Sequence, residues 1–223
     1  MICQIYSIQT PQEAVDVIRA GADHIGVVPG NCNIPGGITN EMAKRIFESV
    51  GDSAVKVALS IADDPQEIIC MAQELKPDIV HISGPNYVAD PQLAEDFDRL
   101  CPGVKIMQAI PVTGPECIEK AKVLSGFVDY LILDSVSNNA AGIGASGITN
   151  DWSVGRQIVE ASSVPVILAG GLCSRNVTAA IWTVRPWGVD SMTRTDRVLA
   201  NGESLKDIEK VAAFCRAAKG EGL

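Results

Sequence analysis

The sequence has few aromatic residues and fewer basic than acidic ones. Phe, Trp and Tyr make up only 4% of its 223 residues, so the core must be built from Val, Ile, Leu and Ala. These residues fill buried parallel strands and the helices that cover them. The 18 Lys and Arg are outnumbered by 27 Asp and Glu, and the net charge of -9 disfavours binding to nucleic acid or to an anionic membrane. The composition favours an α/β protein that acts on a small molecule.

Long apolar runs and metal-binding motifs are also missing. No run approaches the roughly 18 residues that span a bilayer, and no basic segment precedes an apolar stretch at the start. The seven cysteines have no CxxC spacing, which indicates free thiols and a reducing cytoplasm. The only histidines, His24 and His81, have no second ligand at a useful spacing. We therefore expect no metal, no cofactor and no membrane contact.

Apolar runs of strand length alternate eight times with amphipathic stretches. Thr10 and Asp64 are placed as N-caps, each followed by a proline at the first helical position. Eight such units of roughly 28 residues suit short loops and close naturally into a barrel. We predict a single-domain (β/α)8 TIM barrel over residues 1–223. Expected strands cover 1–6, 23–28, 54–61, 78–83, 104–110, 127–134, 164–170 and 187–192; expected helices cover 10–22, 39–51, 64–76, 90–100, 114–126, 152–162, 174–184 and 204–220.

In such a barrel the chemistry lies where strands end and the following loops begin. Paired glycines, Gly170 and Gly171, end the seventh expected strand, and their N–H groups could approach a phosphate closely. Ser191, Thr193 and Arg194 follow the eighth expected strand, and these two loops often form a phosphate site. We prefer a phosphate site to the alternative, in which the glycines only make a turn and Arg194 is a solvated charge.

Asp134 ends the sixth expected strand directly after an apolar run, "LIL". A carboxyl group among apolar neighbours has a raised pKa and can act as a general acid. An N-cap or a loop-fixing hydrogen bond explains the position equally well. His81, at the end of the fourth expected strand, could shuttle protons, although a single histidine is more often a structural residue.

The stretches "LILD", "GASGITNDW", "PVILAGGLCSRNVTAAI" and "PWGVDS" resemble the phosphoribosylanthranilate isomerase family of tryptophan biosynthesis. The resemblance covers nearly the whole chain and implies the barrel fold. It also implies an Amadori rearrangement, in which a general acid opens a ribosylamine ring and a base moves a proton from sugar C2. It assigns the acid role to Asp134. The substrate phosphate would be bound by Ser146 and Gly147 in the loop after the sixth expected strand, together with the glycine pair and residues 191–194.

Several positions depart from the family pattern. Tyr6 stands where the family has its general-base Cys, and a tyrosine is a poor base at neutral pH unless a cation lowers its pKa. His81 and Gln108 replace a Gln and a Lys at strand ends, and the loop after the second expected strand lacks the family's Arg. The base is therefore Tyr6, His81 or another group.

Three functions remain open from the sequence. The first is a phosphoribosylanthranilate isomerase-like enzyme with Asp134 as the acid. The second is a divergent barrel enzyme, an isomerase or an aldolase-type lyase, acting on another phosphosugar. The third is a non-catalytic protein that binds a phosphorylated metabolite. In each case the ligand is a small phosphorylated molecule, and we expect a monomer or a homodimer.

Overall fold

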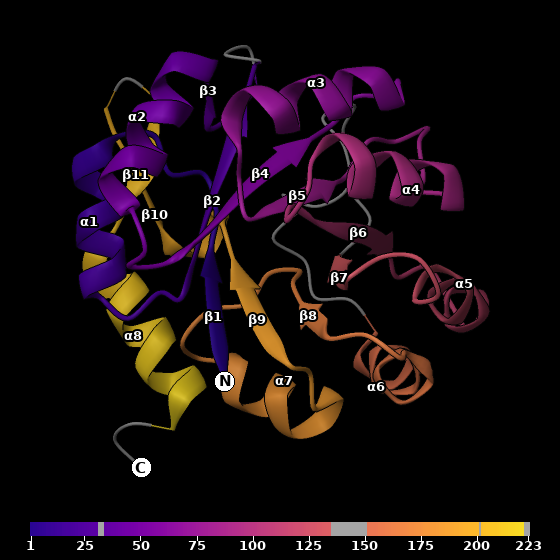
Figure 1. The fold of residues 1–223 in the computed structure, drawn as a ribbon. Coiled ribbons are helices and arrows are strands. Elements are labelled where there is room, and N and C mark those ends of the chain that lie inside the picture. Colours follow the sequence, from indigo (N-terminus) through magenta and orange to yellow (C-terminus); the bar gives the residue numbers. More distant parts are fainter. Residues whose placement is uncertain (31–33, 135–150, 201, 221–223) are drawn as a thin grey trace.

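Eight parallel strands close into a barrel in the computed structural model, which describes residues 1–30, 34–134, 151–200 and 202–220 (Figure 1). Each strand pairs with its neighbour in parallel, and pairing of the first strand with the second closes the ring. The (β/α)8 barrel predicted from the sequence is confirmed. The barrel strands are β1 (Ile2–Ile5), β2 (His24–Pro29), β4 (Val55–Ser60), β5 (Ile79–Ile82), β6 (Lys105–Pro111), β7 (Tyr130–Asp134), β8 (Val166–Leu168) and β9 (Gly188–Ser191).

Within the described ranges, eight α-helices surround the barrel, and the caps expected at Thr10 and Asp64 form. The hydroxyl of Thr10 accepts a hydrogen bond from the N–H of Glu13 at 3.1 Å, and the Asp64 carboxylate accepts one from Gln66 at 2.9 Å. A proline follows each cap. The helices are α1 (Pro11–Arg19), α2 (Asn40–Val50), α3 (Pro65–Leu75), α4 (Pro91–Leu100), α5 (Glu116–Leu124), α6 (Trp152–Ala161), α7 (Val177–Val184) and α8 (Ile208–Lys219). None of these is long and apolar enough to cross a membrane.

The last predicted helix began too early. Residues 204–206 form a strand, β11 (Ser204–Lys206), which pairs antiparallel with β10 (Asp196–Val198), and α8 starts only after the N-cap Asp207. The stretch "SLK" had the charge and apolar pattern of a first helical turn, but its backbone forms sheet bonds with β10. A further two-residue strand, β3 (Gly37–Ile38), pairs in parallel with the last two residues of β2 (Figure 1).

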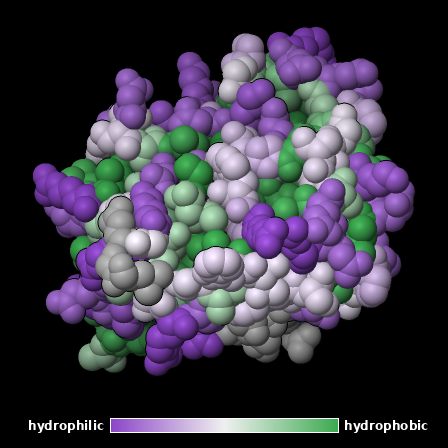
Figure 2. Space-filling model, turned by 90° about the horizontal axis from the view of Figure 1, so that it is seen from below, coloured by the Kyte–Doolittle hydropathy of each residue, from purple (hydrophilic) through white to green (hydrophobic). Residues whose placement is uncertain are grey.

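Aliphatic side chains fill two layers. The larger one lies between the strands and the helices, and the smaller one fills the barrel interior. Polar residues are also buried inside the barrel, and Gln4, His24 and Asp190 form a hydrogen-bonded series there. On the face seen in Figure 2, hydrophilic residues surround smaller hydrophobic areas, as is normal for a water-exposed surface.

Three aspartates hold the end of the barrel where the strands begin. Asp23, Asp78 and Asp129 each precede a strand, and each accepts a hydrogen bond of 2.7 to 2.9 Å from a backbone N–H of the preceding barrel strand. Each also pairs with a lysine, as Lys219 does with Asp23 at 3.0 Å. At this end of the barrel, carboxylates have structural roles.

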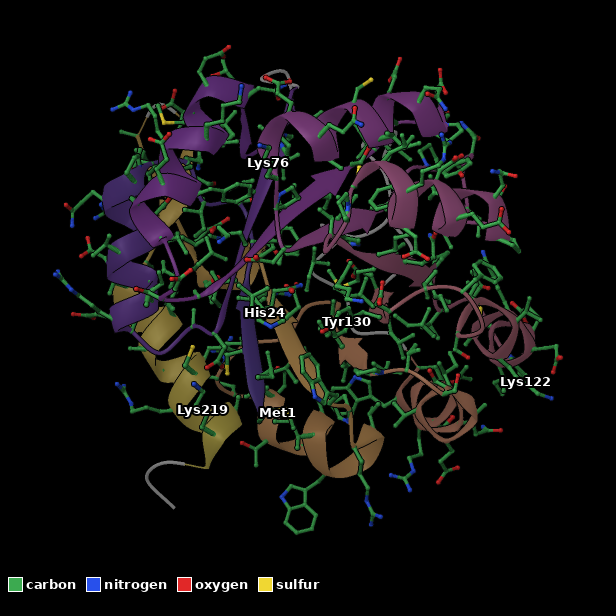
Figure 3. All side chains as sticks on the ribbon, in the orientation of Figure 1. Met1, His24, Lys76, Lys122, Tyr130 and Lys219 are labelled. Carbon is green, nitrogen blue, oxygen red and sulfur yellow. The ribbon has the colours of Figure 1, made fainter. Side chains whose placement is uncertain are left out.

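His24 lies in the same part of the molecule, near Tyr130 and on the side where the chain starts (Figure 3). Its Nδ1 is 3.1 Å from Oε1 of Gln4, and its ring is 5.8 Å from that of Trp187. Burial lowers the pKa of His24 to about 4. The imidazole is therefore neutral in the folded protein at neutral pH.

Replacing His24 with Gln should make the protein less sensitive to acid. Between pH 6.5 and pH 4 the unfolded chain takes up a proton at His24 that the folded chain does not, so wild-type stability falls by up to roughly 1.4 kcal/mol per pH unit from this group. Urea unfolding of both proteins at pH 7 and pH 5 gives their free energies of unfolding. The effect is the larger loss of this free energy, from pH 7 to pH 5, in the wild type than in His24→Gln. Parallel stability curves for the two proteins would show that His24 is not held neutral.

Candidate active site

A cavity of about 260 Å³ opens where the barrel strands end. Its wall includes side chains from β5, β7 and β9, Tyr6 directly after β1, and the two glycines after β8. The sequence-predicted residues Tyr6, His81, Asp134, Gly170, Gly171, Ser191, Thr193 and Arg194 all line this cavity. Eight residues chosen by their position at strand ends thus lie around one space.

Tyr6 and His81 form a buried pair in the cavity wall. The Tyr6 hydroxyl is 2.6 Å from Nδ1 of His81, and the two ring centroids are 5.4 Å apart. Burial lowers the pKa of His81 to about 3. Burial, with the charges of Asp190 and Asp134, raises the pKa of Tyr6 well above its ordinary value. Both groups are neutral at pH 7, and Nε2 of His81 is buried without a hydrogen-bond partner in the described part of the chain.

Gly26 on β2 makes room for the Tyr6 ring. A Cβ atom at position 26 would lie 2.7 Å from Cγ of Tyr6, closer than real Cβ contacts. The large side chain at position 6 therefore depends on a glycine across the strand pair.

Asp134 ends β7 at the rim of the cavity and is partly exposed. Its negative charge raises the pKa of both Tyr6 and Asp190, which places its carboxyl group within electrostatic reach of both.

Asp190 lies on β9, directly opposite Gln4 on β1, and is only 6% exposed. Nε2 of Gln4 donates to Oδ1 of Asp190 at 3.1 Å. Burial, then the charge of Asp134, raises the pKa of Asp190 to about 8, although the Gln4 bond and the Lys206 charge oppose the shift. Asp190 is thus mostly protonated at pH 7, and it lines the cavity. Sequence reasoning missed it, although an acid inside the apolar run of β9 was a visible signal.

The glycine pair and Arg194 line the same cavity as the acids. Gly170 and Gly171 have φ angles of +88° and +66°, which side-chain-bearing residues rarely adopt. Their N–H groups have no hydrogen-bond partner among the described residues. The Asn176 side chain fixes the turn by donating to the Gly171 carbonyl at 3.1 Å. Two backbone donors beside a guanidinium group form a suitable site for a phosphate.

Lys206 on β11 is a buried cation behind this wall. Its ammonium group pairs with Asp196 and donates to the carbonyl of Met192 at 2.9 Å. Sequence reasoning missed this lysine because its segment was expected to be helical. Its contacts hold the β10–β11 hairpin against the loop after β9.

One predicted residue in the described part of the chain, Gln108, is not among those that line the cavity. Gln108 is buried, and its side chain bonds to the backbone of Ala89, Ile82 and Ala109, so it fixes the wall. Ser146 and Gly147 lie outside the described residues. Elsewhere in the described ranges no cluster of His, Cys, Asp and Glu could hold a metal ion.

A (β/α)8 barrel whose mouth holds a cavity lined by two acids, a glycine pair and an arginine is typical of an enzyme that acts on a small molecule. The family model for N-(5'-phosphoribosyl)anthranilate isomerase matches residues 3–217, and the chain belongs to that family. It is an isomerase, as the resemblance implied.

Individual relatives agree with this assignment. The N-(5'-phosphoribosyl)anthranilate isomerase of Haloferax volcanii is 33% identical over 95% of this chain and 89% of its own length. The Thermotoga maritima enzyme has a solved structure that covers 99% of this chain and all of its own, with 25% identity and a TM-score of 0.79. Another solved enzyme, 24% identical over 99% of this chain and all of its own with a TM-score of 0.77, shares the fold and was solved with reduced 1-(o-carboxyphenylamino)-1-deoxyribulose 5-phosphate.

Replacing Gly26 with Ala should displace Tyr6 and cost roughly 1 to 3 kcal/mol, because the added methyl group overlaps the ring. Gly155→Ala on α6 is the matched control, since its Cβ would lie 3.5 Å from Val184, an ordinary contact. Thermal unfolding measures both variants. Equal melting temperatures for Gly26→Ala and the wild type would contradict the packing described here.

Replacing Asp190 with Asn should stabilise the protein, increasingly as the pH rises from 4 to 8. The folded wild type binds a proton at Asp190 over this range and the unfolded chain does not, so ionising the buried group costs up to roughly 5 kcal/mol at pH 8. The amide has no charge to bury. Denaturant unfolding at pH 5 and pH 8 tests this, with Asp98→Asn on the surface of α4 as the control. If the free energies of unfolding of Asp190→Asn and the wild type differ by the same amount at both pH values, the expectation is wrong.

Proposed function

We propose that the chain catalyses the Amadori isomerisation of N-(5'-phosphoribosyl)anthranilate, the reaction for which its family is named. The observation that carries the proposal is that Asp134 and the glycine pair after β8 line one cavity. The acid and the anion site are then within reach of opposite parts of one small phosphosugar. The proposed pathway is tryptophan biosynthesis.

In this proposal Asp134 protonates the ring oxygen of the ribosylamine. Its position at the end of β7 and at the rim of the cavity supports the role, because a group that is partly solvated can be reprotonated from water between turnovers. Gly170, Gly171 and Arg194 hold the phosphate, together with Ser146 and Gly147 in the loop outside the described residues. Thr193 begins a short 3₁₀ helix beside them, and the Ser191 hydroxyl donates to the Leu172 carbonyl.

The base cannot be assigned to Tyr6 by analogy with the family's cysteine. A phenol whose pKa lies above its ordinary value does not ionise near neutral pH. His81, with a pKa of about 3, accepts a proton only weakly. Both residues are better suited to hydrogen-bonding a substrate hydroxyl group from the wall.

The altered base position also supports a second candidate. A divergent enzyme that acts on another phosphosugar, or a protein that only binds one, would retain the anion site and tolerate a neutral Tyr6–His81 pair. Thermal-shift measurements with phosphorylated sugars identify such ligands, since a ligand that binds only the folded state raises the melting temperature.

Loss of the substrate's anthranilate fluorescence measures the proposed reaction. We expect turnover by the wild type and a loss of about 10²- to 10⁴-fold in kcat for Asp134→Asn, because the amide cannot donate the proton. Asp98→Asn should retain full activity. Wild-type turnover no faster than the uncatalysed reaction would rule out this substrate, and an active Asp134→Asn variant would rule out the acid assignment.

A further inference from the structure

We propose that Asp190 is the catalytic base of this reaction and removes the proton from sugar C2. The inference rests on the proposed function and assigns the role that Tyr6 and His81 cannot fill. It makes the site a two-carboxyl system, with Asp134 at the rim and Asp190 at the floor of the same cavity.

The position of Asp190 in the barrel supports this role. β9 and β1 are neighbours, with Asp190 opposite Gln4 and Ser191 opposite Ile5. Tyr6 follows two residues after Gln4, and its backbone N–H bonds to the Ser191 carbonyl at 3.2 Å. Asp190 therefore lies on the strand next to Tyr6, one layer deeper, and its side chain also lines the cavity.

The hydrogen bond from Gln4 fixes which oxygen is available. Oδ1 accepts the amide N–H of Gln4, and this is the only hydrogen bond of the carboxyl group within the described residues. Oδ2 has no such partner and is not among the fully enclosed polar atoms, so it can face the cavity. A carboxylate can accept but not donate, so Gln4 must present its N–H₂ to Asp190 and its Oε1 to Nδ1–H of His24. Gln4 and His24 are positioning residues in this arrangement.

The charges around Asp190 determine how basic it is. Gln4 on β1 and Tyr6 directly after it are neutral groups beside Asp190, and Asp134 on β7 raises the pKa of Asp190 whenever it is charged. Lys206 on β11 adds a positive charge, reduced by its partner Asp196, and Arg194 lines the same cavity. Burial outweighs the cation and gives the carboxyl a pKa of about 8, some four units above an ordinary aspartate. Such a carboxylate is a much stronger base than one in water, which suits abstraction of a carbon-bound proton.

The proton transfers balance with these two groups. Asp134 gives its proton to the ring oxygen, the bond from C1 to that oxygen breaks, and the nitrogen lone pair forms C1=N⁺. The Asp190 carboxylate takes the C2 proton, the C2–H electron pair forms C1=C2, and the C1=N⁺ π pair returns to nitrogen. Protonated Asp190 can then protonate C1 as the enol O–H loses its proton to water, and Asp134 regains its proton from water. The product is an isomer of the substrate, and no co-reactant is consumed.

The experiment measures kcat/KM with phosphoribosylanthranilate between pH 6 and pH 9 for the wild type and for the Asp190→Asn, Asp190→Glu and Gln4→Leu variants, with Asp98→Asn as the control. For the wild type we expect kcat/KM to rise about tenfold per pH unit from pH 6 and to level off near pH 8. At the pH where the wild-type profile is level, Asp190→Asn should have a kcat/KM at least about 100-fold lower than the wild type, and Asp190→Glu should retain part of the activity. Gln4→Leu removes the N–H that stabilises the carboxylate, so its rising limb should move to higher pH, an effect that a purely structural role would not produce.

The outcomes separate the two claims. An inactive wild type overturns the proposed function and this inference with it. If the wild type is active and Asp190→Asn keeps more than about a tenth of the wild-type kcat/KM, the inference is overturned but the proposed function stands. If Asp190→Asn fails to fold, the wild-type profile decides, since a profile that is flat from pH 6 to pH 8 also overturns the assignment.

Discussion

Burial of the Asp190 carboxyl group is the constraint on which the site depends. A carboxyl group with one hydrogen-bond donor and little water cannot easily ionise, so it either remains protonated or destabilises the fold. Gln4 supplies that donor and is itself held by His24, which must stay neutral to fit its own pocket. Three polar residues thus lie in a barrel interior that also holds the Tyr6–His81 pair and is otherwise filled mainly by Val, Ile, Met and Ala. Such networks cost stability, and they are common at functional sites.

The two ends of the barrel use aspartate differently. Where the strands begin, Asp23, Asp78 and Asp129 accept backbone N–H groups and pair with lysines. Where the strands end, Asp134 and Asp190 line a cavity, and the charge of Asp134 raises the pKa of Asp190. Two carboxyl groups in different environments can exchange roles as proton donor and acceptor, which the family reaction requires. The same residue type therefore supports the fold at one end and, in our proposal, catalysis at the other.

The repeating parts of the fold could be predicted from the sequence. Apolar runs recur in every unit, caps such as Thr10 and Asp64 with a proline after them mark some of the helix starts, and barrel geometry then places the strand ends together. This located Asp134, Tyr6, His81 and the glycine pair in one cavity. The hairpin of β10 and β11 could not be predicted, because "SLK" is short and only its pairing with residues 196–198 makes it a strand. Asp190 was missed because its role depends on long-range contacts with Gln4 and Asp134, 186 and 56 residues away along the chain.

The central claim is that a buried carboxyl group on β9 holds a proton near neutral pH. Carbon-13 NMR of the aspartate side-chain carboxyl groups, recorded from pH 4 to pH 10 and assigned by the signal that Asp190→Asn removes, measures this directly. We predict that this signal titrates with a midpoint near pH 8. A midpoint below about pH 5, the range of ordinary aspartates, would contradict the account.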